Sequence, residues 1–314
     1  MTVSDLLDGA FKLYKANFGS ILVVDLVFVA PFQLAAAFAQ RNTFGGQSFL
    51  RVFSSPSTLS AQRGSSPGST IARGVVLLLD LLLVPFVAGA ISRIVGASYL
   101  GQEISAGPAL RATARRWLSL LAAWVMIHLM ELGGLVMGLL FVGVAVAFSG
   151  PGRVIGVLVA VGAFLVSGPV ALAVMALSVM VAPAIVAEDL GPIRGIRRSW
   201  RLVRRRFWPV LGTALLAGFM ASILGSVIGA GPQIAAFGIG LKWGWIILGA
   251  GSVVVSALTL PIVAITATLL YFDARIRTEG FDLQVLAMNL ASPIQRPIQP
   301  PFQPPSRPPT SPVG

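Results

Sequence analysis

Long apolar runs alternate with short amphipathic segments along this chain of 314 residues. Six runs are long enough to cross a membrane as helices, because about 20 apolar residues span the hydrocarbon core. The six predicted spans are Ser20–Ala39, Gly74–Ala97, Leu118–Phe148, Ile155–Val181, Trp208–Ile228 and Trp243–Phe272. Pro169 and Pro261 are predicted kinks, since proline lacks the N–H group that a helix needs.

A short basic phrase stands before every second run. It occurs as AFKLYKANFGSIL at residues 10–22, ALRATARRWLSLL at 109–121 and SWRLVRRRFWPVL at 199–211. In each phrase a basic residue lies six positions before an aromatic one: Lys12 before Phe18, Arg111 before Trp117 and Arg201 before Phe207. We predict three parallel two-span repeats, about residues 4–100, 102–186 and 188–290, each opened by a basic helix in the membrane interface.

Composition supports the same fold class. Hydrophobic residues make up 56% of the chain and charged residues only 11%, whereas soluble domains carry about 25% charged residues. We therefore predict an all-α polytopic membrane protein with a membrane domain over residues 1–290. Residues 41–73, rich in Ser, Gly and Pro, are expected to form a flexible extracytoplasmic loop, and the proline-rich residues 291–314 a disordered cytoplasmic tail.

Lysine and arginine are distributed unequally between the two sides of the predicted spans. Six of the 23 fall on one side: Arg41, Arg51, Arg63, Arg73, Arg153 and Lys242. The other 17 fall on the side that holds both termini. The positive-inside rule therefore predicts an inner (plasma) membrane protein with both termini in the cytoplasm. These loops explain the net charge of +12, and without a nucleic-acid-binding motif we expect no nucleic-acid partner.

The third basic phrase carries the highest density of charge. Its arginines are Arg194, Arg197, Arg198, Arg201, Arg204, Arg205 and Arg206. We predict that they engage anionic lipids of the inner leaflet, or an unidentified membrane or cytoplasmic protein. The alternative is that the basic helices are elbows that anchor each pair of spans.

Ionisable residues inside predicted spans are costly and are candidates for function. Asp25 and Arg93 lie near the inner ends of the first two spans and are predicted to form a structural ion pair. Asp80, His128 and Glu131 lie at compatible depth in the outer half of the membrane. They are predicted to form a polar cluster that holds a proton or a cation, or alternatively to make structural hydrogen bonds between helices.

Motifs for enzymatic chemistry are missing from the sequence. The chain has no cysteine and one histidine, so neither a thiol nucleophile nor a zinc site is expected. It contains no P-loop, no GxSxG and no paired carboxylates at metal-ligand spacing. We predict a non-enzymatic protein without a cofactor or a metal.

Three phrases carry a family resemblance: LLDGAFKLYKANFGSIL at Leu6–Leu22, AEDLGPIRGIRRSWRLVRRRFW at Ala187–Trp208 and LLYFDARIRTEGFDL at Leu269–Leu283. In the last phrase acidic and basic residues alternate from Asp273 to Asp282, which predicts a salt-bridged cap against the basic helices. Together the phrases resemble a family of uncharacterised actinobacterial multi-pass membrane proteins, similar to the membrane domain of glycerophosphoryl diester phosphodiesterase. The catalytic barrel of that enzyme is missing, so the resemblance implies the membrane portion alone.

These observations predict that the protein is a membrane scaffold or accessory subunit. It would engage anionic lipid or partner proteins by its basic cytoplasmic face. The alternative is a transporter or channel for a small ion or lipid that uses the predicted polar cluster. An intramembrane enzyme is the least favoured hypothesis.

Overall fold

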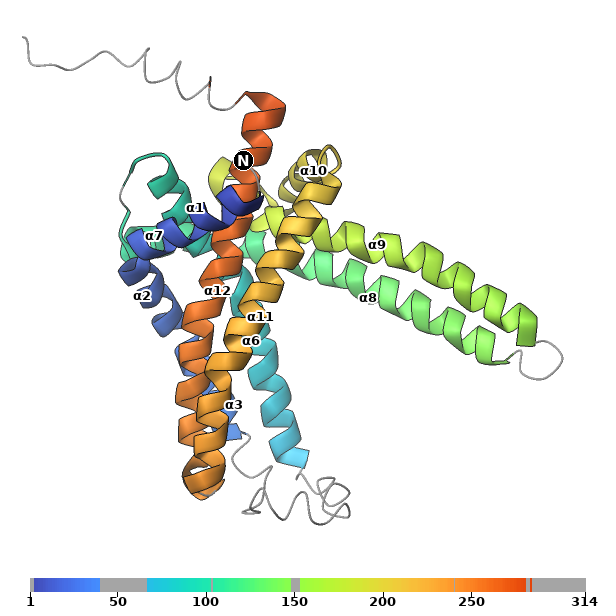
Figure 1. Cartoon of the computed structure of the whole chain (residues 1–314), viewed down its shortest axis with the longest axis horizontal. Coiled ribbons are helices and arrows are strands. Elements are labelled where there is room, and N and C mark those ends of the chain that lie inside the picture. Colours follow the sequence, from blue (N-terminus) through green and yellow to red (C-terminus); the bar gives the residue numbers. More distant parts are fainter. Residues whose placement is uncertain are drawn as a thin grey trace, which may run out of the picture.

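The computed structural model describes residues 3–39, 67–102, 104–147, 153–239, 241–280 and Leu283. The regular secondary structure of these residues is entirely α-helical (Figure 1). The helices are α1 (Val3–Ala16), α2 (Phe18–Phe28), α3 (Ala30–Ala39), α6 (Pro67–Tyr99), α7 (Ala106–Ala114), α8 (Trp117–Ala147), α9 (Arg153–Glu188), α10 (Pro192–Val203), α11 (Phe207–Ile239) and α12 (Leu241–Glu279).

Six helical segments are long and apolar enough to cross a membrane. They are Phe18–Phe38, Leu82–Tyr99, Trp117–Val144, Val154–Glu188, Phe207–Ala236 and Trp243–Glu279. Each overlaps one of the six spans predicted from the sequence. The predicted fold class, an all-α multi-pass membrane protein, is confirmed.

The first span differs from the continuous helix that was predicted. It is interrupted at Val29, between α2 and α3. Pro31 follows the break and has no N–H group to offer the carbonyl four residues earlier, so the helical ladder cannot continue unchanged. The N–H groups of Phe32 and Gln33 instead both donate to the Val29 carbonyl oxygen, at 3.1 and 3.0 Å.

Other predicted boundaries also move. Residues 67–73 belong to the start of α6, although the predicted loop extended to residue 73. Residues 41–66 of that loop lie outside the described residues, as does the predicted tail. Pro169 and Pro261 both lie inside long helices, α9 and α12, and their kinks stay predictions.

The helices divide into a bundle and an arm. The bundle contains α2, α3, α6, α11 and α12, and the paired helices α8 and α9 project from it as the arm (Figure 1). In the bundle, α12 contacts α11, α3, α6 and α1. The arm exposes large apolar side chains along its length, from Leu129 to Val144 on α8 and from Val154 to Val170 on α9. Lipid is as apolar as these side chains, so such exposure carries little cost in a membrane.

One end of the bundle holds the short helices α1, α7 and α10 and the C-terminal part of α12, and we call it the basic end (Figure 1). A short helix precedes each pair of membrane-length segments: α1 before α2–α3 and α6, α7 before α8 and α9, and α10 before α11 and α12. This order agrees with the predicted positions of the basic helices, and the threefold repeat itself stays a prediction. The fully buried side chains near this end include Leu202 of α10 and Tyr271 of α12.

Candidate functional site at the basic end

Cationic side chains from several helices converge on the C-terminal end of α9. Arg93 of α6 donates a hydrogen bond from Nη1 to the Val186 carbonyl oxygen at 2.7 Å. Arg116, between α7 and α8, donates from Nε and Nη2 to the two carboxylate oxygens of Asp189 at 2.7 and 2.6 Å. The last carbonyls of a helix carry partial negative charge, so cations are stabilised there. The end of α9 therefore links α6 to the α7–α8 junction.

Asp189 also ends α9 through its backbone. Its φ is 56°, in the left-handed region that Asp and Asn enter more readily than most residues. The Leu190 N–H group then donates to the Ile185 carbonyl oxygen at 3.0 Å and closes the last turn. The hydrogen bonds from Arg116 hold the pKa of the Asp189 carboxyl below its ordinary value. Asp189 is therefore an ionised side chain that turns the chain towards α10.

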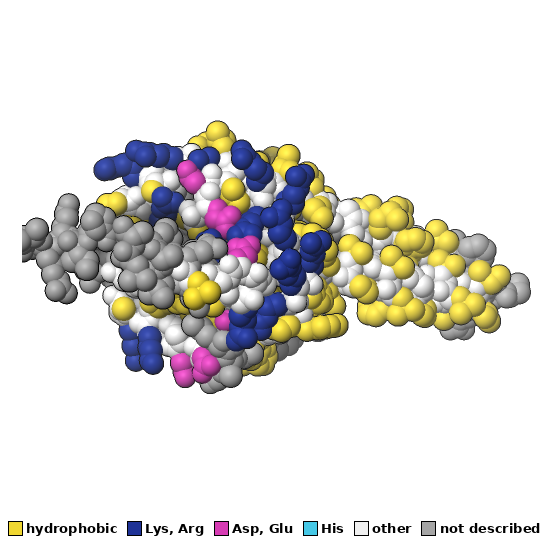
Figure 2. Space-filling view, turned by 90° about the horizontal axis from the view of Figure 1, so that it is seen from above, with side chains coloured by type: hydrophobic (Ala, Val, Ile, Leu, Met, Phe, Trp, Pro, Cys, Tyr) yellow, Lys and Arg dark blue, Asp and Glu magenta, His cyan; other side chains and the backbone are white. Residues whose placement is uncertain are grey.

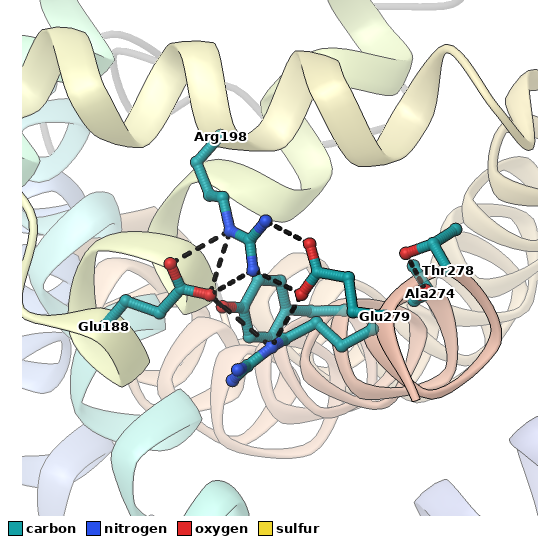
Figure 3. Close-up of polar contacts among 7 residues, drawn as sticks. Glu188, Arg198, Ala274, Thr278 and Glu279 are labelled. Carbon is teal, nitrogen blue, oxygen red and sulfur yellow. Dashed lines mark hydrogen bonds and ion pairs between the residues drawn. The ribbon is translucent and has the colours of Figure 1, made fainter. Parts of the chain in front are cut away.

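Arg198 of α10 lies between two carboxylates, Glu188 at the end of α9 and Glu279 at the end of α12 (Figure 3). Its Nε and Nη2 donate to Glu188 Oε1 at 2.9 and 2.6 Å, and Nη2 also donates to Glu279 Oε2 at 2.6 Å. A further hydrogen bond joins Nη1 to the other Glu279 oxygen. Only 13% of the Arg198 side chain is exposed. The hydrogen bonds to Glu279, and then those to Glu188, raise the pKa of the guanidinium, so Arg198 is permanently charged.

Two residues of α12 complete this network. The buried Tyr271 donates from its hydroxyl to Glu188 Oε1 at 2.5 Å. Arg275 Nε lies 3.5 Å from carboxylate oxygens of both Glu188 and Glu279, and its guanidinium lies 5.7 Å from the centre of the Tyr271 ring. Two arginines and two glutamates thus balance in charge where α9, α10 and α12 meet.

A second group of ion pairs joins the start of α11 to α12. Arg206 Nη1 lies 2.7 Å from Asp273 Oδ2, and Arg277 Nε lies 3.1 Å from Asp273 Oδ1. With the Arg198–Glu279 contact, these pairs confirm the salt-bridged cap that the alternating charges of the closing phrase predicted. Asp282 of that phrase lies outside the described residues.

The seven arginines of the third basic phrase therefore have two different roles. Arg198 and Arg206 were predicted with the other five to engage lipid or a partner, but the structure holds both in ion pairs within the molecule. Their side chains lie next to acidic side chains at the ends of α9 and α12. If these arginines turned out to solvent, those carboxylates would be left without a partner, which is costly where they are partly buried. The other five are exposed, and within the described part of the chain their side chains have no ion pair: Arg194, Arg197, Arg201, Arg204 and Arg205.

The helix that carries these arginines is fixed on α9. Gly195 faces Ile185 so closely that a Cβ atom would overlap the isoleucine side chain. Ser199 Oγ donates to the Leu177 carbonyl oxygen at 2.7 Å and is wholly buried. On the remaining faces, Ile193 is 58% exposed and Trp200 is 42% exposed. Helix α10 thus has a packed face, an exposed apolar face and a basic face.

Figure 2 views the basic end from above. Lys and Arg side chains gather over the bundle, and several lie where the arm begins. The visible surface of the arm is formed mainly by hydrophobic side chains and carries no Lys or Arg among its coloured residues. The positive charge of the described residues is therefore concentrated at one end of the bundle, directly beside an extended apolar surface.

The predicted ion pair between Asp25 and Arg93 is wrong. Asp25 of α2 is wholly buried, and neither of its carboxylate oxygens has a hydrogen-bond partner within the described residues. Arg93 instead reaches the Val186 carbonyl oxygen. The physical reason is that the end of α9 offers Arg93 both a helix C-terminus and the nearby charge of Asp189.

Two of the three residues of the predicted outer polar cluster lie next to each other, and the cluster itself stays a prediction. His128 Nε2 lies 3.8 Å from Glu131 Oε2 on α8, and the His128 ring stacks on Trp124 with a centroid distance of 3.7 Å. His128 and Glu131 both line a cavity of about 390 Å³ between α6, α8, α9 and α12. Asp80 belongs to α6, but its side chain lies outside the description. In the described ranges, no group of three or more acidic or histidine side chains is placed to hold a metal ion.

A family described as a domain of unknown function, DUF7847, matches the chain over residues 1–274. The chain belongs to this family. The match includes the first five membrane-length helices and continues to Ala274 of α12, and it excludes the proline-rich tail. It agrees with the predicted likeness to an uncharacterised family and shows no link to glycerophosphoryl diester phosphodiesterase. No curated protein and no solved structure matches the chain.

Several residues of the site were not identified from the sequence. Glu188 and Asp189 were part of the family phrase, but nothing in it assigned them to Arg198 and Arg116. One signal was available: an acidic pair at the end of a span, followed within ten residues by a basic helix. Two acidic side chains at a helix C-terminus oppose the helix dipole, so cations are expected beside them.

Proposed function

We propose that the protein is a non-enzymatic membrane scaffold or accessory subunit that engages anionic lipid, or a partner protein, through α10. The observation that carries this proposal is the division of the arginines. Two are neutralised inside the fold, and the other five stay exposed beside the exposed Ile193 and Trp200. An interfacial helix combines these two surfaces, because its apolar face enters the acyl chains and its basic face meets head groups.

The proposed orientation places the basic end in the cytoplasm, with both termini on that side of the inner membrane. Its support is the excess of Lys and Arg in the segments that join the spans at this end. The inner leaflet is rich in anionic lipid, and each Lys or Arg near it contributes about 1 kcal/mol. Five exposed arginines on and just after one short helix are therefore enough for strong electrostatic binding.

The resemblance to the membrane domain of glycerophosphoryl diester phosphodiesterase is an expectation from the sequence, and none of the comparisons links the chain to that enzyme. The proposed function includes no phosphodiesterase activity, because the catalysis of that family takes place in a soluble barrel. The proposed role is accordingly that of a membrane part which holds lipid or a partner.

The test compares two charge-removal variants of the full chain. In the first, the five exposed arginines, Arg194, Arg197, Arg201, Arg204 and Arg205, are replaced with Gln. In the control, Lys12, Lys15, Arg111 and Arg115 of the other two short-helix segments are replaced with Gln. We expect the first variant to lose most of its enrichment of phosphatidylglycerol over phosphatidylcholine after purification, and the control to keep it. Equal phosphatidylglycerol enrichment in the wild type and in the first variant would exclude lipid binding by α10. Equal capture of membrane partner proteins by these two would exclude the scaffold role.

A second candidate function, a transporter or channel, is favoured by the cavity that His128 and Glu131 line. The cavity lies between the bundle and the arm, and it combines mainly apolar walls with one acidic and one histidine side chain. In proteoliposomes that contain a pH-sensitive dye, Glu131→Gln is expected to abolish proton flux if the cavity is part of a pathway. Flux that is equal in wild type, Glu131→Gln and empty liposomes excludes this function for protons.

A further inference from the structure

A second cavity lies at the base of the arm, where α10 crosses α8 and α9. Its volume is about 440 Å³, within the range of roughly 300–1,000 Å³ that small-molecule sites occupy. The residues that define it are Met130 of α8, Val174 and Leu177 of α9, and Ile196, Arg197 and Trp200 of α10. Arg197 is the one ionisable residue in this lining, so the cavity is an apolar groove with a single cation.

The surroundings of the groove restrict what can occupy it. Met130, Val174 and Leu177 belong to segments that are long and apolar enough to cross a membrane. The groove therefore opens among the acyl chains of the bilayer. An acyl chain is the apolar group available there, and it matches the lining without leaving a polar atom unpaired.

The charge at the rim selects the head group. Arg197 is exposed and forms no ion pair with any described residue, and Arg194 and Arg201 lie three and four residues away on the same face of α10. Arginine binds phosphate oxygens through two parallel hydrogen bonds, which a permanently charged, planar guanidinium provides. Trp200 lines the groove beside Arg197, and tryptophan is enriched at the level of lipid head groups.

The packing of α10 makes this groove part of the folded structure. The close contact between Gly195 and Ile185 and the hydrogen bond from Ser199 to Leu177 hold α10 against α9. The ion pairs of Arg198 fix the same helix to α12. A preformed site binds its ligand with less loss of conformational entropy than a helix that orders only on contact.

We propose that this groove is a phospholipid site, in which one acyl chain lies along Val174, Leu177 and Ile196 and the anionic head group binds Arg197. The proposal rests on the proposed function and makes it more specific. Electrostatic adsorption alone needs only the five exposed arginines, whereas this site needs the groove as well.

The experiment uses the full chain in detergent with phosphatidylglycerol whose acyl chains carry bromine. Bromine quenches tryptophan fluorescence on contact, and the signal from Trp200 is the difference between wild type and Trp200→Phe. Ala173→Phe fills the groove, because Ala173 lines it, and Ala171→Phe is the matched control on the exposed side of α9. We expect Ala173→Phe to lose the Trp200 quenching and Ala171→Phe to retain it.

Arg197→Gln keeps the groove open and removes the cation, so it remains informative if Ala173→Phe fails to fold. We expect it to weaken phosphatidylglycerol binding about tenfold, the effect of one charged hydrogen bond. Brominated phosphatidylcholine is expected to quench Trp200 less than brominated phosphatidylglycerol in the wild type.

The outcomes separate this site from the broader proposal. If Ala173→Phe and Arg197→Gln both bind and quench like the wild type while the five-arginine variant loses lipid, the groove site is wrong and the basic surface stands. If the five-arginine variant also keeps its lipid, both proposals fail. Equal quenching by the two brominated lipids overturns the selection of an anionic head group.

Discussion

Arg198 and Glu279 are 81 residues apart in the chain, yet the guanidinium of Arg198 donates two hydrogen bonds to the Glu279 carboxylate. The contact joins α10 to the end of α12, the last membrane-length helix. The same guanidinium also holds Glu188, so one side chain connects the ends of α9 and α12 through α10. The basic phrase therefore has an internal structural role as well as an exposed charged surface.

Arg198→Gln is expected to lower the free energy of unfolding by about 1.5–3 kcal/mol, the range for hydrogen bonds to charged groups. The physical reason is that Glu188 and Glu279 would keep their charges next to each other with only the longer 3.5 Å contacts of Arg275 to compensate them. Thermal unfolding in detergent measures the change. The control is Arg197→Gln, which removes the same charge from the exposed neighbouring position and is expected to leave stability within about 0.5 kcal/mol of wild type. Equal stability of the two variants would contradict the assigned role of Arg198.

Gly195→Ala is expected to destabilise the fold by about 1–3 kcal/mol, because a new Cβ atom overlaps the Ile185 side chain. This result would be opposite to the usual gain from Gly→Ala inside a helix. Gly212→Ala in α11 is the control, since no atom of another helix lies within 4 Å of its Cβ position. Ile185→Ala removes the overlapping side-chain atoms, so Gly195→Ala is expected to cost less in the Ile185→Ala background than in the wild type. A stabilised Gly195→Ala variant would show that α10 does not lie as close to α9 as the structure has it.

Asp189→Asn is expected to remove a stability contribution that depends on pH. The pKa of the Asp189 carboxyl is lowered in the folded state by Arg116, so its ion pair stabilises the fold above the ordinary carboxyl value of 3.8. The contribution is lost as the pH falls from that value through the lowered pKa. Asn tolerates the left-handed backbone at this position, so the variant isolates the charge.

Thermal unfolding of wild type and Asp189→Asn at several pH values measures this effect. The two unfolding temperatures are expected to differ at neutral pH and to approach each other in acid. A constant difference across that range would assign the effect to something other than the charge of Asp189. Asp189→Gly is the control for the backbone conformation, since glycine enters the same φ region without a side chain.

Asp25→Asn is expected to leave thermal stability equal or higher. Both carboxylate oxygens of Asp25 are buried without a hydrogen-bond partner among the described residues, so an ionised side chain there carries an uncompensated desolvation cost. Arg93→Gln is expected to be destabilising, because the Val186 carbonyl oxygen loses its donor. The double variant should show additive effects, since the two side chains have different surroundings. A coupling energy of more than about 1 kcal/mol between the two substitutions would support the ion pair that the sequence predicted.

Apolar run length was enough to predict all six membrane segments, because a bilayer imposes the same minimum length on every spanning helix. The break at Val29 was missed, although Pro31 was visible, because a proline can kink a helix or interrupt it and the neighbouring helices decide which. The alternation of charge in the closing phrase correctly predicted a cap. It did not identify the partners of Glu279 and Asp273, which come from α10 and from the residue before α11.

The sequence by itself determined the class of protein, the number of spans and the position of the basic segments. These properties depend on local composition and on the uniform thickness of the membrane. Tertiary structure alone decided which arginines are exposed and which are held in ion pairs. Arg197 and Arg198 are neighbours of identical chemistry. Only the packing of α10 on α9 turns Arg198 towards Glu188 and Glu279 and leaves Arg197 exposed. Tertiary structure also decided that Asp25 and Arg93 do not meet, since pairing depends on the relative rotation and depth of helices and not on their separate sequences.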